Sequence, residues 1–394
     1  MRAKPIVVVF PFVGDEVGGS HVSAINLISK LDRTRVSPII VLHQSDGPLA
    51  EYLAQQQMSY VLAPAAPILA PAYRSQPGKR LQTVMRYIAA LPRLIRFLST
   101  AGVEIVHTND GRMHTTWGLP TRLTGAKLLW HHRGDPEARG ANILAPLLAN
   151  HIVTVSNFAR PSRPIIPIER KVTVLHSPFD HPTSLPDRTA CRLTIAQELG
   201  LGAQARFAGY FGVFVERKRP VLFVDVIAAY LDRYPDAPLH GLLFGRPETD
   251  GPRLDEAVVA RAATLGISDR IHLMGHRSPV APYLCSVDTL LVPAVSEPFG
   301  RTLIEAMLLG TPVIATAHGG NIEAVSSGNN GFLVEPETPH SFVEPLHRLL
   351  TDDAEWDRIS VTARREALDH YGVMAHIQGV TGIYDRLARP TAAN

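Results

Sequence analysis

Two carboxylates, Glu297 and Glu305, stand eight positions apart in the stretch SEPFGRTLIEAMLLGTPVIATAHGGN, residues 296–321. Glu297 follows a predicted strand, TLLVPAV, and Glu305 falls in the first or second turn of a predicted helix. The start of a helix offers unpaired N–H groups and a positive dipole end to an anion. A diphosphate could lie there, with one carboxylate accepting from a ribose diol and the other from sugar hydroxyls. Spacing alone favours a simpler interpretation, in which Glu305 only favours the helix start and Glu297 is solvated.

A basic cluster, Arg217 to Arg219, follows another predicted strand in GYFGVFVERKRP, residues 209–220. Basic side chains between a strand and a helix can neutralise a diphosphate leaving group. Gly212 stands at the end of that strand. Taken in isolation, however, the cluster favours a solvated positive loop.

A glycine pair, Gly18 and Gly19, opens a predicted helix after the first strand in FPFVGDEVGGSHVSAINL. Glycines at such a place let the backbone approach a phosphate or a sugar closely. The spacing is not G-x-G-x-x-G, which counts against a dinucleotide-binding fingerprint. A plain loop is the simpler interpretation of the pair.

Polar side chains follow two further predicted strands. LLWHHRGD, residues 128–135, places His131 and His132 at a strand end, and EIVHTNDGR supplies Asn109 and Asp110. Polar groups clustered at strand ends are candidates for binding or catalysis, although a single histidine is more often structural. No Asp-x-Asp occurs and no histidine or cysteine set has ligand spacing, so we predict no metal site.

Two successive series of short apolar strands must position these residues. The first series comprises PIVVVF, VSPIIVLH, VEIVHT, KLLWHH, HIVTVS and KVTVLHS, and the second comprises ARFAGYFG, LHGLLFG, RIHLMG, TLLVPAV, TPVIAT and GFLVEP. Continuous apolar strands that alternate with amphipathic helices are typical of parallel sheets covered on both faces. The sequence therefore predicts two doubly wound α/β domains, as the length of 394 residues also favours.

The domain boundary is predicted in SPFDHPTSLPDRTA, residues 177–190, which is rich in Pro, Ser and Asp and has no periodicity. We accordingly predict a first domain over residues 1–180 and a second over 181–372. The region from about Pro339 to Arg389 is predicted as successive helices. The last of these, residues 373–394 around Tyr384, is predicted to cross back and brace the first domain.

Composition narrows the class of protein. A formal net charge of +3 gives no global case for nucleic-acid binding. Cys191 and Cys285 lie far apart, which is typical of reduced thiols in a cytosolic protein. Pro11 and two early acids argue against a signal peptide, and no apolar stretch reaches the length of a membrane span. The sequence therefore predicts a cytoplasmic protein.

The long stretch SEPFGRTLIEAMLLGTPVIATAHGGNIEAVSSGNNGFLVEPET resembles the nucleotide-sugar site of glycosyltransferase family 4, the retaining "glycosyl transferases group 1" with the GT-B fold. The shared pattern is Glu, seven residues, Glu, then a Gly-Thr-Pro-Val strand start, a Gly-Gly pair and a Gly-Phe-Leu-Val segment. The resemblance extends more weakly from about Ile6 to Arg389. It implies two Rossmann-like domains that face a cleft, the first on the acceptor side and the second binding the nucleotide sugar.

The resemblance also implies roles for individual residues. Glu297 would contact the donor sugar, His131 the transferred sugar or acceptor, and Lys218 the departing diphosphate, so these three are the catalytic candidates. The donor-binding candidates are Gly18, Gly19, Gly212, Arg217, Lys218, Phe299, Gly300, Arg301, Thr302 and Glu305. The acceptor-side candidates are His132, Asn109 and Asp110, and His132 competes with His131 for the sugar. Val213 stands where the family has an arginine, which leaves open whether Arg217 compensates.

A basic region precedes these candidates. Residues 52–103 contain six basic residues and no acid, namely Arg74, Lys79, Arg80, Arg86, Arg93 and Arg96. A helix over residues 79–98 would place Lys79, Arg86 and Arg93 on one face, with Pro92 predicting a kink or two shorter helices. Such a helix can rest on anionic lipid at the inner face of the membrane, or its basic face can simply be solvated.

We therefore expect a retaining, metal-independent hexosyltransferase of glycan or cell-envelope biosynthesis. Its donor would be a nucleoside-diphosphate sugar, most simply a UDP- or GDP-sugar, and its acceptor a glycan, a lipid-linked sugar or a small molecule. No cofactor and no nucleic acid is expected. The alternatives are a nucleotide-sugar epimerase of similar architecture and a non-catalytic nucleotide-sugar-binding protein, which Val213 slightly favours.

Overall fold

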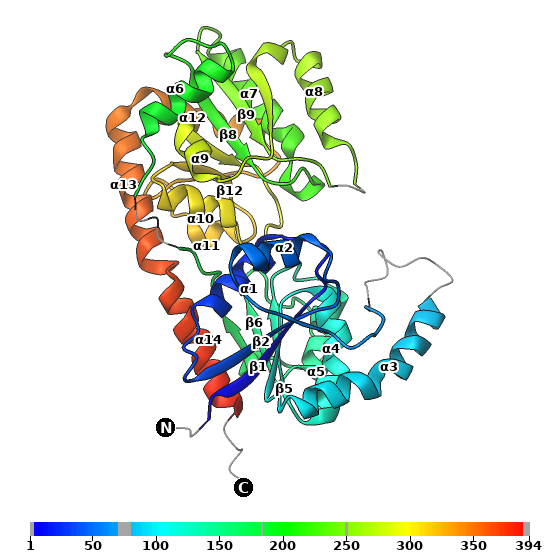
Figure 1. Cartoon of the computed structure of the whole chain (residues 1–394). Helices are drawn as coiled ribbons and strands as arrows, with labels where there is room; N and C mark the ends of the chain where they lie inside the picture. Colours follow the sequence, from blue (N-terminus) through cyan, green and yellow to red (C-terminus); the bar gives the residue numbers. More distant parts are fainter. Residues whose placement is uncertain (1–3, 70–79, 181, 183, 249–250, 389–394) are drawn as a thin grey trace. The chain divides into compact units, whose positions relative to one another are not determined.

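The computed structural model describes residues 4–388 apart from 70–79, 181, 183, 249 and 250 (Figure 1). The chain forms two compact units, one of residues 1–178 and 373–394 and the other of residues 179–372. Each unit is built on one parallel sheet packed with helices, so the predicted pair of parallel α/β domains is confirmed. Among the described residues, no helix is both long and apolar enough to cross a membrane.

The first unit has a seven-stranded sheet in the order β3-β2-β1-β4-β5-β6-β7. Its strands are β1 Ile6–Phe12, β2 Val36–Leu42, β3 Val61–Leu62, β4 Ile105–Thr108, β5 Lys127–His132, β6 His151–Thr154 and β7 Val172–Val174. Its α-helices are α1 Gly19–Ser29, α2 Pro48–Gln55, α3 Arg80–Thr100, α4 Gly111–Thr124, α5 Ala145–Leu148 and α14 Val373–Ala388.

In strand β1, apolar residues do not alternate with polar ones, and its contacts explain why. Val8 and Phe10 belong to one buried cluster with residues of α1 and α14, including Tyr384. Val9 belongs to a second buried cluster, with residues of α3 and α4 such as Trp117. Since successive side chains of a strand point to opposite faces, both faces of this sheet are covered. Burying one such side chain contributes roughly 1.5–3 kcal/mol.

The second unit has a six-stranded sheet in the order β10-β9-β8-β11-β12-β13. Its strands are β8 Arg206–Phe211, β9 Leu239–Phe244, β10 Ile271–Gly275, β11 Thr289–Val292, β12 Val313–Thr316 and β13 Phe332–Val334. Its α-helices are α6 Arg188–Glu198, α7 Pro220–Arg233, α8 Leu254–Thr264, α9 Ala281–Ser286, α10 Arg301–Leu308, α11 Asn321–Ala324, α12 Val343–Thr351 and α13 Asp353–His370.

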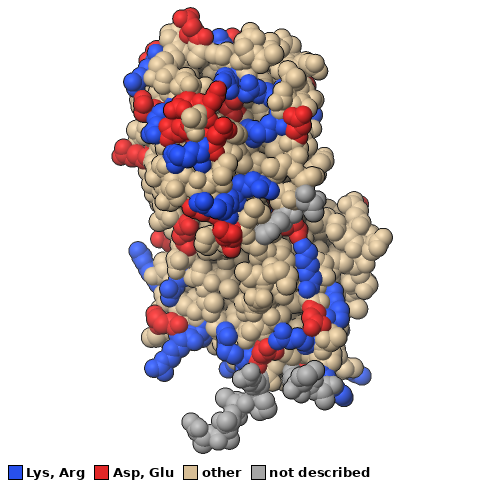
Figure 2. All heavy atoms as spheres, turned by 90° about the vertical axis from the view of Figure 1, so that its left-hand side faces the viewer, with Lys and Arg blue, Asp and Glu red and all other residues tan. Residues whose placement is uncertain are grey.

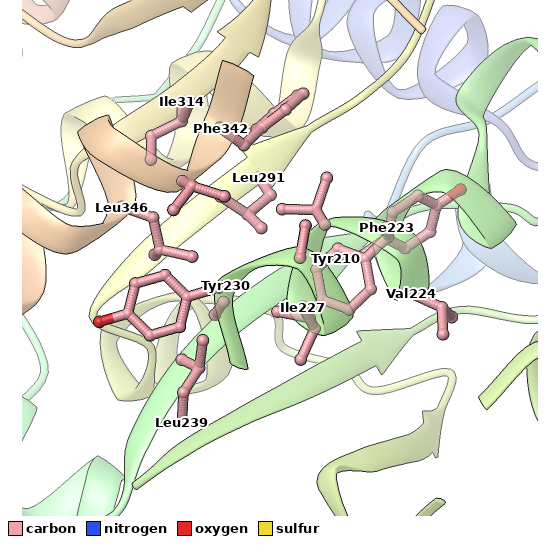
Figure 3. Close-up of a cluster of buried hydrophobic side chains, with 14 of the residues drawn as sticks. Tyr210, Phe223, Val224, Ile227, Tyr230, Leu239, Leu291, Ile314, Phe342 and Leu346 are labelled. Carbon is pink, nitrogen blue, oxygen red and sulfur yellow. The ribbon is translucent and has the colours of Figure 1, made fainter. Parts of the chain in front are cut away.

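A buried cluster fixes α7 and α12 on one face of this sheet. Ile227 and Tyr230 of α7 pack with Leu291 of β11 and Leu346 of α12 (Figure 3). Alternate residues of the central strands therefore face these helices. The loops at the carboxyl ends of β8 and β11 are thereby held on a rigid base.

Two local predictions need correction. Residues 188–190, predicted to be part of the irregular linker, already belong to α6, because the Asp187 side chain accepts from the backbone N–H groups of Thr189 and Ala190. That cap is a sequence signal for a helix start. Pro92 lies inside the single helix α3, so the alternative of two shorter helices is wrong.

Charged side chains are mixed in sign over the face drawn in Figure 2. Lys and Arg lie among Asp and Glu there, without one continuous basic area. This distribution agrees with the small formal net charge. Nucleic-acid binding requires a basic stripe or patch, which this face does not present.

Candidate functional site

The candidate site of the second unit lies at the carboxyl edge of its sheet. Strands β8 and β11 are hydrogen-bonded neighbours, and the loops that follow them carry Lys218 and Glu297. Helix α10 starts at Arg301, and its N-cap residue Gly300 has no side chain with which to cap the first N–H groups. The sequence thus folds a strand end, a glycine turn and a helix start into one edge, where open α/β sheets bind ligands.

Glu297 is held by two cations. Its side chain is nearly buried, and its Oε2 lies 3.2 Å from Lys218 Nζ and also accepts from Arg217 Nη1. Burial opposes ionisation of this carboxyl, but attraction to Lys218 and Arg217 outweighs it and lowers the pKa of Glu297. The carboxylate is therefore charged at neutral pH and fixed in position.

Glu305 lies one turn into α10, where Arg301 Nη2 donates to it at 3.2 Å. Enclosure of the carboxyl raises the pKa of Glu305, and the attraction of Arg301 offsets this only in part. The Arg301 guanidinium stacks over the Phe179 ring at 4.5 Å from its centroid. Phe299 packs in the same aromatic group, so its side chain is buried and only its backbone is available to a ligand.

A small cavity of about 20 Å³ brings four of the predicted residues together. Lys218, Glu297, Gly300 and Thr302 line it, along with the strand ends of β8 and β11. Arg217 contacts Glu297 but does not line this cavity, and its side chain is 45% exposed. Of the two cations on Glu297, Lys218 is therefore the one placed beside the start of α10.

Glycines outside the predicted set support the Glu297 loop. A Cβ on Gly319, whose φ is +64°, would lie 2.6 Å from the Glu297 carbonyl oxygen. The N–H of Gly320 donates to that same oxygen at 2.8 Å. The Gly-Gly pair of the quoted motif therefore lets two backbones meet and fixes where Glu297 stands.

Gly212 is held in a similar way at the end of β8. Its N–H donates to the Phe244 carbonyl at 2.9 Å, and a Cβ on Gly245 would lie 1.9 Å from the Gly212 carbonyl oxygen. A Cβ on Gly212 would lie 3.3 Å from Lys218 Nζ, so a larger residue there would crowd the Lys218 side chain. Gly245 comes directly after β9, as Gly212 comes directly after β8. A glycine at the end of a second predicted strand is the sequence signal by which Gly245 could have been found.

The glycine pair of the first unit opens α1. Gly18 is the N-cap residue, and its N–H donates to His21 Nδ1 at 3.1 Å. Gly19 is the first residue of the helix. The structure therefore gives this pair a structural role at the helix start, and places His21, which was not predicted, beside it.

Asn109 and Asp110 follow β4, as predicted. Asp110 caps α4, since its Oδ1 accepts from Arg112 N at 2.9 Å and Met113 N at 3.0 Å. Its Oδ2 and the Oδ1 of Asn109 are buried, and neither has a hydrogen-bond partner among the residues that the structure describes. Burial raises the pKa of Asp110, partly offset by the capping N–H of Met113.

His131 and His132 end β5 but differ in their contacts. His132 Nε2 donates to the Asp135 carbonyl at 2.9 Å, which closes the following turn. His131 is completely buried, and its Nε2 has no hydrogen-bond partner in the described part of the chain. Burial, with the nearby Arg133 charge, holds the pKa of His131 well below its usual value, so its imidazole is neutral. Of the two rivals, only His131 has a buried ring nitrogen without a hydrogen-bond partner among the described residues.

The structure thus gathers the second-unit candidates at one sheet edge and places the first-unit candidates at the strand ends of their own sheet. Within the described part of the chain, no group of three His, Cys, Asp or Glu side chains has an arrangement that could hold a metal ion.

Comparison with known families concerns mainly the second unit. Residues 205–352 match the model of the family described as Glycosyl transferases group 1. This match confirms the resemblance over that stretch, while the narrower assignment to family 4 stays a prediction.

Curated relatives match a part of the chain of similar size. The D-inositol 3-phosphate glycosyltransferase of Corynebacterium urealyticum is 32% identical over 157 residues, which cover 39% of this chain and 37% of that protein. The protein of the same name from Corynebacterium glutamicum is 35% identical over 161 residues, which cover 40% of this chain and 38% of that protein. The chain therefore spans about two fifths of the length of these relatives.

Solved structures match over nearly the whole chain. HepE of Anabaena, solved in complex with UDP and glucose, has a TM-score of 0.77 at 19% identity and covers 96% of this chain and 99% of its own. A glycosyltransferase from Rickettsia africae has a TM-score of 0.78 at 17% identity, covering 98% of this chain and 100% of its own. These likenesses, with the two parallel-sheet units, confirm the predicted GT-B fold class.

Proposed function

We propose that the chain is a glycosyltransferase that transfers a sugar from a nucleoside-diphosphate sugar, with a UDP-sugar as the first donor to test. The observation that carries this proposal is the meeting of Lys218, Glu297 and the uncapped start of α10 around one cavity. That edge lies within the stretch matched by Glycosyl transferases group 1. The structures of HepE of Anabaena with UDP and with UDP-glucose support the choice of uracil as the base of the donor nucleotide.

The second unit would hold the donor. The diphosphate lies at the start of α10, where the helix dipole and N–H groups favour an anion. The bond between the anomeric carbon and the diphosphate oxygen breaks, and the diphosphate leaves with the electron pair, stabilised by Lys218. An acceptor hydroxyl forms the new bond to the anomeric carbon, and its proton passes to the departing diphosphate. In this proposal Glu297 orients the sugar, the anomeric configuration is retained and no metal is required.

Replacing Glu305 by alanine tests the assignment of its carboxylate to the ribose. We expect one class of donor, tested among UDP-, GDP-, ADP- and TDP-sugars, to raise the Tm of the wild type by about 5–10 °C at a hundredfold excess over its Kd. A charged hydrogen bond is worth about 1.5–3 kcal/mol, so Glu305→Ala should bind that donor roughly 10- to 100-fold more weakly. Thermal-shift titration measures both effects.

The matched control for this panel is Glu344→Ala, at an exposed glutamate of α12 in the same unit. It should respond to the donor as the wild type does. If the donor raises the Tm of the wild type and of Glu305→Ala equally, Glu305 does not bind the ribose. The absence of any shift with all four donor classes would contradict the proposed function itself.

We further propose that helix α3 contacts an anionic membrane surface, where a lipid-linked acceptor would be presented to a cytoplasmic enzyme. Leu81, Met85 and Ile88 recur at helical spacing on α3 and are more than half exposed. Arg86 and Arg93 are exposed on the same helix. Arg74 and Lys79, which the sequence added to this basic region, lie outside the described residues, as does the side chain of Arg80.

Vesicle binding tests the membrane proposal. We expect vesicles with 30% anionic lipid to retain the protein at low salt and to release it at high salt, because the attraction is screened. Each arginine near such a surface contributes about 1 kcal/mol, so Arg86→Gln with Arg93→Gln should weaken retention about 30-fold. Leu147→Ser, at an exposed leucine of α5, is the control. Failure of the wild type to bind at low salt would dismiss the contact.

A further inference from the structure

Three buried histidines and one buried tyrosine form a continuous cluster in the first unit. The Tyr384 hydroxyl lies 2.6 Å from His107 Nδ1, and His107 Nε2 lies 3.1 Å from His131 Nδ1. The His131 ring stacks on His107 at a centroid distance of 5.3 Å and on His376 at 5.8 Å. His107 and His131 come from β4 and β5, whereas His376 and Tyr384 come from α14.

The contacts determine which nitrogen of His131 carries the proton. Arg133 Nη2 lies 3.3 Å from His131 Nδ1, and a guanidinium can only donate. His131 Nδ1 is therefore an acceptor, and the proton of the neutral ring is on Nε2. It follows that His107 donates through Nε2 to His131, and that the Tyr384 hydroxyl donates to His107 Nδ1. The one lone pair of His131 Nδ1 is then shared by two donors, His107 Nε2 and Arg133 Nη2.

His376 has the opposite tautomer. Its Nδ1 lies 2.7 Å from the His176 carbonyl oxygen, which can only accept. The proton of His376 is therefore on Nδ1, and its Nε2 carries a lone pair. Burial lowers the pKa of His376 to about 3, so the ring is neutral at physiological pH.

The two Nε2 atoms are complementary and uncommitted. Both are buried, and neither has a hydrogen-bond partner within the part of the chain that the structure describes. One is an N–H donor and the other a lone-pair acceptor, on stacked rings inclined by 23°. A buried polar atom without a partner costs free energy, and such atoms are usually satisfied by a bound group. A hydroxyl is the group that can accept from one and donate to the other at once.

We propose that His131 and His376 form a binding site for one hydroxyl group, which accepts a hydrogen bond from His131 Nε2 and donates one to His376 Nε2. The hydroxyl belongs to an ordered water or to a sugar. Tyr384, His107 and Arg133 are positioning residues, since they fix the tautomer of His131 without touching the hydroxyl. Only the sugar alternative rests on the proposed function.

Nitrogen-15 NMR of histidine-labelled protein, assigned with single His→Gln variants, tests the proposal. We expect His131 as the Nε2–H tautomer and His376 as the Nδ1–H tautomer, with a slowly exchanging His131 Nε2 proton. If water fills the site, the His131 Nε2 proton shows an NMR contact to a bound water, and addition of UDP-glucose does not change this contact. If a sugar fills it, UDP-glucose shifts the Nε2 signals of both rings and UDP alone does not.

His376→Phe keeps a stacked ring and removes the acceptor. If water fills the site, this variant should abolish the bound-water contact. If a sugar fills it, the variant should weaken the affinity for UDP-glucose about fivefold relative to the affinity for UDP. His114→Phe, at a buried histidine stacked on Trp130, should change neither. The proposal is overturned if either ring has the other tautomer, or if the His131 proton meets neither water nor sugar. If the protein does not bind UDP-glucose, the proposed function is contradicted. The tautomers of the two histidines and the bound water still test the hydroxyl site in that case.

Discussion

Lys218→Met is expected to lower kcat about 10²- to 10³-fold, because in the proposed function Lys218 is the cation that meets the charge developing on the departing diphosphate. Lys218 lines the cavity at the start of α10 and lies 3.2 Å from Glu297. Arg217 still neutralises the buried Glu297 in this variant, so the protein should stay folded. Initial rates of UDP release from UDP-glucose, with a panel of acceptors, measure the loss.

Arg217→Met is the matched control, because Arg217 binds the same carboxylate but does not line the cavity. Its kcat should stay within about fivefold of the wild type, a loss near 1 kcal/mol. The pair of variants also decides whether Arg217 compensates for the valine at position 213. A larger loss from Arg217→Met than from Lys218→Met would transfer the role to Arg217 and contradict the assignment.

Gly319→Ala is expected to destabilise the second unit by about 3 kcal/mol and to weaken donor binding. Its φ of +64° strains any other residue, and the new Cβ would lie 2.6 Å and 2.9 Å from the Glu297 carbonyl oxygen and amide nitrogen. The Glu297 loop must move, which separates its carboxylate from Lys218. Urea unfolding measures the stability, and calorimetric titration with UDP-glucose measures the affinity.

Gly328→Ala separates this contact from backbone strain. Gly328 also has a positive φ, +78°, but a Cβ there meets no atom within 4 Å. The control should therefore lose only the roughly 1–2 kcal/mol of a left-handed non-glycine residue, with unchanged affinity for UDP-glucose. Equal losses of stability in the two variants, with equal affinities, would mean that the Gly319 contact does not position Glu297.

The sequence predicted the two sheets well because their strands are continuous apolar runs. LHGLLFG and TPVIAT contain β9 and β12, and PIVVVF covers β1 from Ile6 to Phe10, two residues short of its end. Strand β3 has only two residues, both exposed, and so carries no such pattern. Where α6 begins depended on a single capping residue, Asp187, inside a stretch whose Pro and Ser content suggested irregular structure.

The sequence brought predicted site residues together where chemistry and chain order coincide, while their roles stay predictions. Glu297 and Lys218 each lie in the loop after a strand, and neighbouring parallel strands bring the ends of their loops together. Partners that depend on packing were missed, because His376 reaches the β5 edge only through the path of α14. The contact of Gly319 with Glu297 depends on how two loops meet, which spacing along the chain does not specify. Separating His131 from His132 likewise required the hydrogen bond to the Asp135 carbonyl.

The division of the chain into units has a consequence for biosynthesis. The second unit is continuous over residues 179–372, whereas the first needs α14 to complete its core, including the buried Val380, Ile383 and Tyr384. On the ribosome, residues 4–178 are made first but cannot complete the burial of that face of their sheet, which α1 covers in part, until residues 373–388 emerge. The unit that is translated second can therefore finish folding first. Until then the exposed sheet face of the first unit is a surface for a chaperone to cover.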